Sequence, residues 1–80
     1  MRTSHELLLK LKYDPRYIFG EVEVFFVDRG APGDMSHIGG QEIRALDSYY
    51  FEIETEQGVK YIPYHRLRRI RYSGETVWER

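Results

Sequence analysis

The feature that most constrains this chain is the absence of cysteine from a sequence of only 80 residues. Neither a disulfide nor a cysteine-bound zinc ion can stabilise it, and a small domain buries proportionally less surface than a large one. The fold must therefore rest on one hydrophobic core, to which the 12 aromatic residues are expected to contribute much of the buried area. We predict a single domain over residues 1–80 that needs no cofactor.

Hydrophobic periodicity predicts one helix near the N-terminus. Leu7, Leu8 and Leu11 recur at helical spacing. Thr3 or Ser4 can cap the first turn. Asp14 precedes a proline, and the residue before a proline avoids the helical conformation. The helix is therefore expected to end there.

Alternating hydrophobic and polar residues predict strands in the rest of the chain. Tyr49, Phe51 and Ile53 are expected to face the core, whereas residues 29–40 are expected to form a loop and residues 64–67 a short helical turn. The predicted strands are 21–28, 41–46, 48–55, 59–64, a segment after residue 67, and 76–80. The predicted fold class is α+β, with one N-terminal helix packed on a bent antiparallel sheet or partial barrel of about five to six strands.

Positive charge is concentrated near the C-terminus. The net charge of −1 predicts no nucleic-acid partner, but residues 1–59 carry a net charge of −5 and residues 60–80 a net charge of +4. Such an asymmetry produces a positive patch on a nearly neutral protein.

The segment IPYHRLRRIRY, residues 62–72, interleaves tyrosines with basic side chains. Basic groups attract phosphates, and aromatic faces stack on unpaired bases. Arg68, Arg69 and Arg71 would then add non-specific attraction for a nucleic-acid backbone. The alternative is a solvated strand face on which these arginines pair with the glutamates of residues 52–56.

The loop DRGAPGD, residues 28–34, holds three charges in a tight bend. Backbone N–H groups in glycine-rich turns bind anions, and Arg29 could donate two parallel hydrogen bonds to a phosphate. The alternative is that Arg29 pairs with Asp28 or Asp34, with Asp34 also capping a turn. The loop lacks the ending of a Walker motif.

The three histidines provide little support for catalysis. His5, His37 and His65 do not have the spacing of a helical metal site, and a site built from Asp34, His37 and His65 is a minor alternative. The sequence assigns no catalytic residue and no metal ligand. One isolated histidine as a general acid or base is weak support for an enzyme.

Nothing in the sequence predicts a membrane protein. No apolar stretch approaches the ~20 residues of a membrane span, and the first residues do not resemble a signal peptide. We therefore expect a cytoplasmic protein that does not associate with membranes.

The chain resembles a family of small, mainly archaeal proteins described as the RNA cyclic-group end recognition domain. Where the pattern of that family often has histidine before Arg-Gly, this chain has Asp28, which argues against a paired acid/base mechanism there. The segments that carry the resemblance are ELLLKLKYDP at 6–15, VFFVDRGAPGD at 24–34, IPYHRLRRIRY at 62–72 and VW at 77–78.

This resemblance implies an RNA-binding module that recognises single-stranded RNA ends, especially ends carrying a 2′,3′-cyclic phosphate. RNA-processing enzymes are the partners that it suggests. Arg29 and Arg66 would contact the phosphate, His65 would donate a hydrogen bond, and Tyr64 would stack on the last base. The expected ligand-binding residues are Arg29, Gly30, Gly33, Asp34, Tyr64, His65 and Arg66.

Two alternative functions belong to other classes. The first is a phosphoesterase that processes RNA ends with His65 and either Asp34 or His37 as its acid/base pair. The second is a protein-interaction domain, which would expose an apolar patch away from Arg29 and His65.

Overall fold

The computed structural model describes residues 3–80, and its single α-helix, α1, spans Ser4–Tyr13. Thr3 caps the helix in a capping box: its hydroxyl accepts a hydrogen bond from the Glu6 N–H, and the Glu6 carboxylate accepts one from the Thr3 N–H. Asp14 ends the helix in an extended conformation, as the following proline predicts. Among residues 3–80 there is no helix long and apolar enough to cross a membrane.

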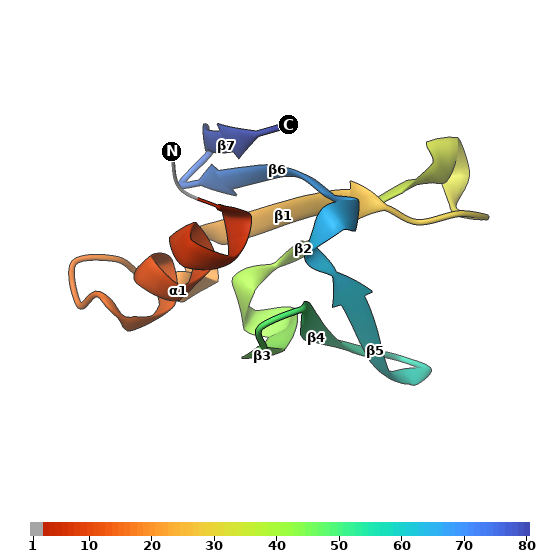
Figure 1. Ribbon diagram of the computed structural model, residues 1–80, viewed down its shortest axis with the longest axis horizontal. Helices are drawn as coiled ribbons and strands as arrows, with labels where there is room; N and C mark the ends of the chain where they lie inside the picture. Colours follow the sequence, from red (N-terminus) through yellow and green to blue (C-terminus); the bar gives the residue numbers. More distant parts are fainter. Residues whose placement is uncertain (1–2) are drawn as a thin grey trace.

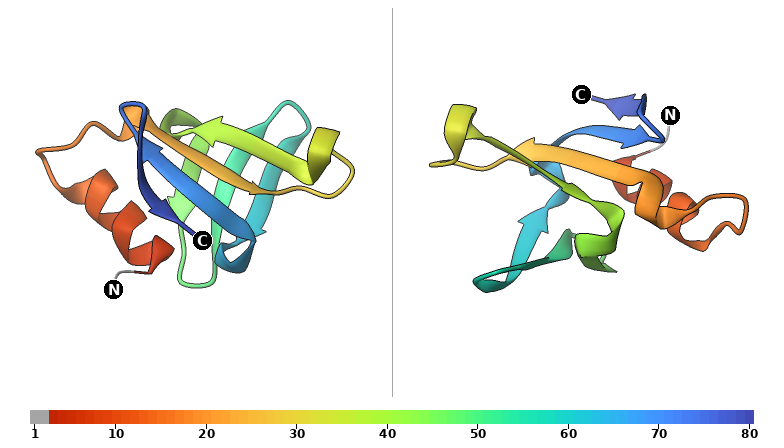
Figure 2. Two further views of the ribbon diagram at one scale, coloured as in Figure 1. Left: turned by 90° about the horizontal axis from the view of Figure 1, so that it is seen from above. Right: turned by 180° about the vertical axis from the view of Figure 1, so that it is seen from behind.

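Seven strands form two antiparallel sheets (Figures 1 and 2). One sheet has four strands in the order β2-β1-β6-β7, and the other has three in the order β3-β4-β5. The 3₁₀ turn η4, Tyr64–Arg66, leads the chain from the three-stranded sheet to the four-stranded sheet. The strands are β1 Val22–Val27, β2 Met35–Gly39, β3 Ile43–Leu46, β4 Tyr50–Thr55, β5 Gly58–Pro63, β6 Leu67–Tyr72 and β7 Glu75–Glu79.

The hydrophobic core lies between the two sheets and α1. The helix contributes Leu8 and Leu11. Every second residue of β1 is buried, so this strand contributes one of its two faces to the core. Phe51, with no exposed surface, packs edge-to-face against Phe26 at a ring-centroid distance of 6.2 Å. The other core residues are Val22, Val24, Ile43, Ile53, Ile62, Leu67 and Ile70.

The α+β class, the helix and the turn at residues 64–66 are confirmed, and three details are corrected. There are seven strands rather than five or six, because residues 35–39 of the expected loop pair with β1 as β2. This short edge strand has no run of buried side chains that could have revealed it. The strands also form two sheets rather than one. Tyr49 is 85% exposed because the turn after Asp47 places it before β4 begins.

Candidate functional site

The loop of residues 28–34 is closed by its own hydrogen bonds. The Gly30 N–H donates to the Asp34 carboxylate at 3.2 Å, and the Ala31 N–H donates to the Asp28 carbonyl at 3.1 Å. The glycines provide the left-handed backbone that the bend requires, with φ of 96° at Gly30 and 67° at Gly33. Of the expected backbone donors, Gly33 alone keeps an N–H without a partner among residues 3–80, so the anion-binding capacity of the loop rests mainly on Arg29.

The acidic residues of the loop are used for structure. The Asp28 carboxylate accepts a hydrogen bond of 2.6 Å from the Ser36 hydroxyl on β2. The alternative that Arg29 pairs with Asp28 or Asp34 is wrong: Arg29 is exposed and has no ion-pair partner within residues 3–80. Arg29 therefore remains available to a ligand.

The loop and η4 lie at the same end of the β1–β6 pair. Phe26 is the register partner of Leu67, so β1 runs out toward residue 28 where η4 leads into β6. The loop then extends away from the body of the protein (Figure 1). The pocket found among residues 3–80 beside η4 is lined by Tyr64 and His65 but not by the loop or Arg66.

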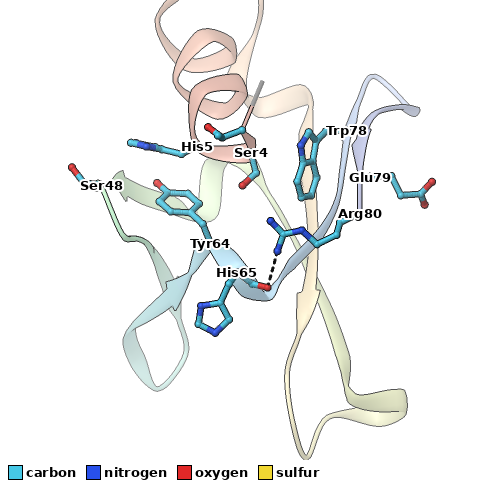
Figure 3. A pocket seen from close by; sticks show the side chains of 9 residues that line it. Ser4, His5, Ser48, Tyr64, His65, Trp78, Glu79 and Arg80 are labelled. Atoms are coloured by element: carbon cyan, nitrogen blue, oxygen red, sulfur yellow. Dashed lines mark hydrogen bonds between the residues drawn. The ribbon is translucent and has the colours of Figure 1, made fainter. Parts of the chain in front are cut away.

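This pocket has a volume of about 700 Å³ and lies where three parts of the chain meet (Figure 3). The first turn of α1, the turn η4 and the end of β7 form its walls, and Ser48 adds to the rim. Its size is within the range of about 300–1,000 Å³ typical of small-ligand sites. The lining residues are Thr3, Ser4, His5, Ser48, Tyr64, His65, Trp78, Glu79 and Arg80.

One side of the pocket suits an anion. Ser4 is 3% exposed, and its hydroxyl points into the pocket in Figure 3. This hydroxyl has no hydrogen-bond partner among residues 3–80. It begins α1, where the positive end of the helix dipole favours negative charge. The Arg80 guanidinium also reaches into the pocket and donates to the His65 carbonyl at 3.2 Å. A hydroxyl, a helix N-terminus and a guanidinium are all groups that can interact favourably with an anion.

The other side of the pocket is aromatic. Trp78 packs against the core, and the Arg80 guanidinium lies 5.5 Å from the centre of its ring. The Tyr64 ring contacts His5 at 4.7 Å and Phe51 at 5.6 Å, and its buried hydroxyl has no hydrogen-bond partner among residues 3–80. Burial raises the pKa of the Tyr64 phenol. Tyr64 is therefore held in place by ring contacts on the pocket wall, and Trp78 adds a second aromatic side chain to the lining.

The alternative interpretation expected the arginines of β6 to pair with the glutamates of residues 52–56. They do not. Glu52 and Glu54 lie on β4 of the three-stranded sheet and Glu56 directly follows that strand, whereas β6 lies in the other sheet. Arg69 instead pairs with Glu79 at 3.3 Å and Arg71 with Glu23 at 3.8 Å. Arg68 donates to the carbonyls of His65 and Leu67.

The histidines lie on separate elements. His37 on β2 stacks on Phe25 at 5.2 Å, away from His65 on η4. Among residues 3–80, no three His, Asp or Glu side chains gather as a metal site, so the constellation of Asp34, His37 and His65 does not form.

A cluster of exposed tyrosines lies on the three-stranded sheet. Tyr50 and Tyr61 contact each other edge-to-face at 5.3 Å, and Tyr61 is 59% exposed. Asp47 and Glu52 lie close enough to raise the pKa of Tyr50. The negative charge around Tyr50 makes this position unfavourable for a phosphate.

Sequence reasoning missed Ser4, Trp78 and Arg80. Ser4 had an obvious structural role as a candidate cap, but Thr3 is the residue that caps the helix. Trp78 belongs to one of the segments that carry the family resemblance. The start of α1 and the end of β7 meet at one pocket only in the tertiary fold, so spacing along the chain does not reveal their proximity.

Comparison with known proteins identifies the family. The model of the MJ1316 RNA cyclic group end recognition domain matches residues 1–80. This chain belongs to that family. The residues of the pocket and of the loop 28–34 thus both lie within the family domain.

Archaeal relatives resemble this member of the family over most of its length. A UPF0248 protein of Thermococcus onnurineus is 39% identical over 75 residues, which cover 92% of this chain and 80% of the relative. A UPF0248 protein of Archaeoglobus fulgidus is 30% identical over 71 residues, covering 89% of this chain and 96% of the relative. No solved structure matches the chain.

Proposed function

We propose that this protein is a non-catalytic module that binds single-stranded RNA ends carrying a 2′,3′-cyclic phosphate. The observation that carries the proposal is the pocket in which the Ser4 hydroxyl and the Arg80 guanidinium lie beside Trp78. The family name describes recognition of the cyclic group at RNA ends, and this pocket offers the chemistry that such a ligand needs. The anionic phosphate would face Ser4 and Arg80, and the flat base would face Trp78 on the aromatic side of the pocket.

In this proposal the terminal phosphate occupies the anionic side of the pocket. Arg80 and the Ser4 hydroxyl donate hydrogen bonds to its oxygens, and the N-terminus of α1 adds favourable electrostatics. The terminal base lies against Trp78, where stacking contributes about 1–3 kcal/mol. A cyclic phosphate is compact and carries one negative charge, which a single guanidinium can neutralise.

The geometry favours binding over hydrolysis. An acid/base pair must reach the same phosphate, with each hydrogen bond spanning about 3 Å. The rings of His5 and His65 point away from each other on either side of Tyr64 in Figure 3. Asp34 and His37, the other candidate partners, do not line the pocket.

Trp78 provides a direct test of where the ligand binds, because it is the single tryptophan of the chain. Titration with a dinucleotide ending in a cyclic phosphate is expected to change its fluorescence in a saturable manner. The midpoint should equal the dissociation constant measured by calorimetry. Binding by calorimetry with no change in Trp78 fluorescence would place the ligand elsewhere.

A further inference from the structure

We infer that the outer face of the four-stranded sheet binds the RNA nucleotides that precede the recognised end, from the pocket toward the loop of residues 28–34. This inference rests on the proposed function and extends it to a second contact surface. The surface is an outer-face strip of three side chains, one from each of three adjacent strands: Arg69, Phe25 and His37.

The strip is a continuous set of contacts. Phe25 is the register partner of both His37 on β2 and Arg69 on β6, so the three residues lie at one level of the sheet. The His37 ring stacks on Phe25 at 5.2 Å with an interplanar angle of 23°, and the Arg69 guanidinium lies 4.9 Å from the Phe25 ring centre. These contacts hold a cation and two aromatic rings in fixed positions on an accessible face.

Exposure leaves the strip open to a ligand. Phe25 alternates with the buried residues of β1, so its side chain faces away from the core and is half-buried by its neighbours. His37 is exposed, and the Arg69 side chain is 42% exposed. Imidazole and guanidinium planes are both surfaces on which unpaired bases stack, and Arg69 also attracts phosphate.

The strip is connected to the pocket through Glu79. This residue lines the pocket, and its carboxylate pairs with the Arg69 guanidinium at 3.3 Å. The order β7-β6-β1-β2 therefore runs from the pocket directly across the strip. An RNA strand that leaves the pocket at the edge of β7 meets Arg69 first and His37 last.

The far end of this path is the loop that carries Arg29. The loop joins β1 to β2, the two strands that supply Phe25 and His37. Arg29 is exposed and has no ion-pair partner within residues 3–80, so no protein carboxylate competes with a phosphate for it. This gives the loop a role distinct from that of the pocket and explains why the loop does not line it.

Two arginines on this face are already paired with carboxylates. Arg69 and Arg71 are each held by one carboxylate, Glu79 and Glu23 respectively. A phosphate on the strip must compete with Glu79 for Arg69. Removing that carboxylate, as in Glu79→Gln, is expected to strengthen the binding of long RNA more than that of short RNA.

The test compares a dinucleotide with an RNA of about eight nucleotides, a length within the usual range of single-strand sites. Each length is prepared with a cyclic-phosphate end and with a hydroxyl end. The longer RNA is expected to bind more tightly with either end. Arg29→Ala and Arg69→Ala should each reduce its affinity roughly 3- to 10-fold, as for the loss of one solvent-exposed hydrogen bond, and leave the affinity for the dinucleotide unchanged.

Arg44→Ala is the matched control, because Arg44 is an exposed arginine paired with Glu54 at 3.8 Å on the other sheet. It should leave the affinity for both lengths unchanged. Equal affinity for the two lengths would overturn the inference, as would equal losses from Arg29→Ala and Arg44→Ala on the long RNA. A length effect that persists without preference for the cyclic end would refute only the end-recognition proposal.

Discussion

Replacing Arg80 with alanine is expected to weaken the binding of cyclic-ended RNA roughly 10- to 100-fold. The guanidinium reaches into the pocket, where it is the arginine that faces the Ser4 hydroxyl and the N-terminus of α1. A hydrogen bond to a charged group contributes about 1.5–3 kcal/mol, and each 1.4 kcal/mol changes a dissociation constant tenfold. Anisotropy of a labelled short RNA measures this loss.

Two comparisons make the Arg80 result specific. Arg80→Lys keeps the charge but loses the planar fork, so it should restore only part of the affinity. Arg44→Ala removes the same charge on the three-stranded sheet and should have no effect. If Arg80→Ala binds cyclic-ended RNA as tightly as the unmodified protein does, Arg80 is not a phosphate ligand.

Replacing Phe51 with alanine is expected to lower the free energy of unfolding by about 3–5 kcal/mol. Phe51 is fully buried and touches Phe26 of the four-stranded sheet as well as Tyr64 of η4. A chain of 80 residues has about 4–12 kcal/mol of stability in total, so this loss removes a large part of it. Urea denaturation followed by circular dichroism measures the change.

Phe51→Leu separates the support of the pocket from the stability of the fold. It retains much of the buried volume, so its loss of stability should be clearly smaller than that of Phe51→Ala. It removes the ring contact that holds Tyr64 at 5.6 Å, and RNA affinity should fall while the protein remains folded. A loss below about 1 kcal/mol for Phe51→Ala would contradict the central place of Phe51 in the core.

Local sequence signals predicted most of the fold. The leucine spacing of α1, the alternation in β1 and the short turn before Leu67 are each determined by neighbouring residues. The edge strand β2 was missed because its pairing with β1 is a tertiary contact and its side chains are mostly not buried. The division into two sheets has the same origin, since no local pattern specifies which strands share a sheet.

The candidate site was harder to predict than the fold. The sequence pointed to Tyr64 and His65, which line the pocket, and to Arg29, which is exposed on a loop outside it. Ser4 and Arg80 lie near opposite ends of the chain, and their individual residue types signal nothing unusual. Only the fold brings the start of α1 and the end of β7 to one pocket.

The most direct test of the central claim is a titration of this protein with one short RNA prepared with three different ends. The RNA carries a 2′,3′-cyclic phosphate, a linear phosphate or a hydroxyl, and Trp78 fluorescence reports occupancy of the pocket. We predict tightest binding for the cyclic end and weakest binding for the hydroxyl end, which lacks the charge that Arg80 neutralises. Equal affinity for the three ends would contradict the account.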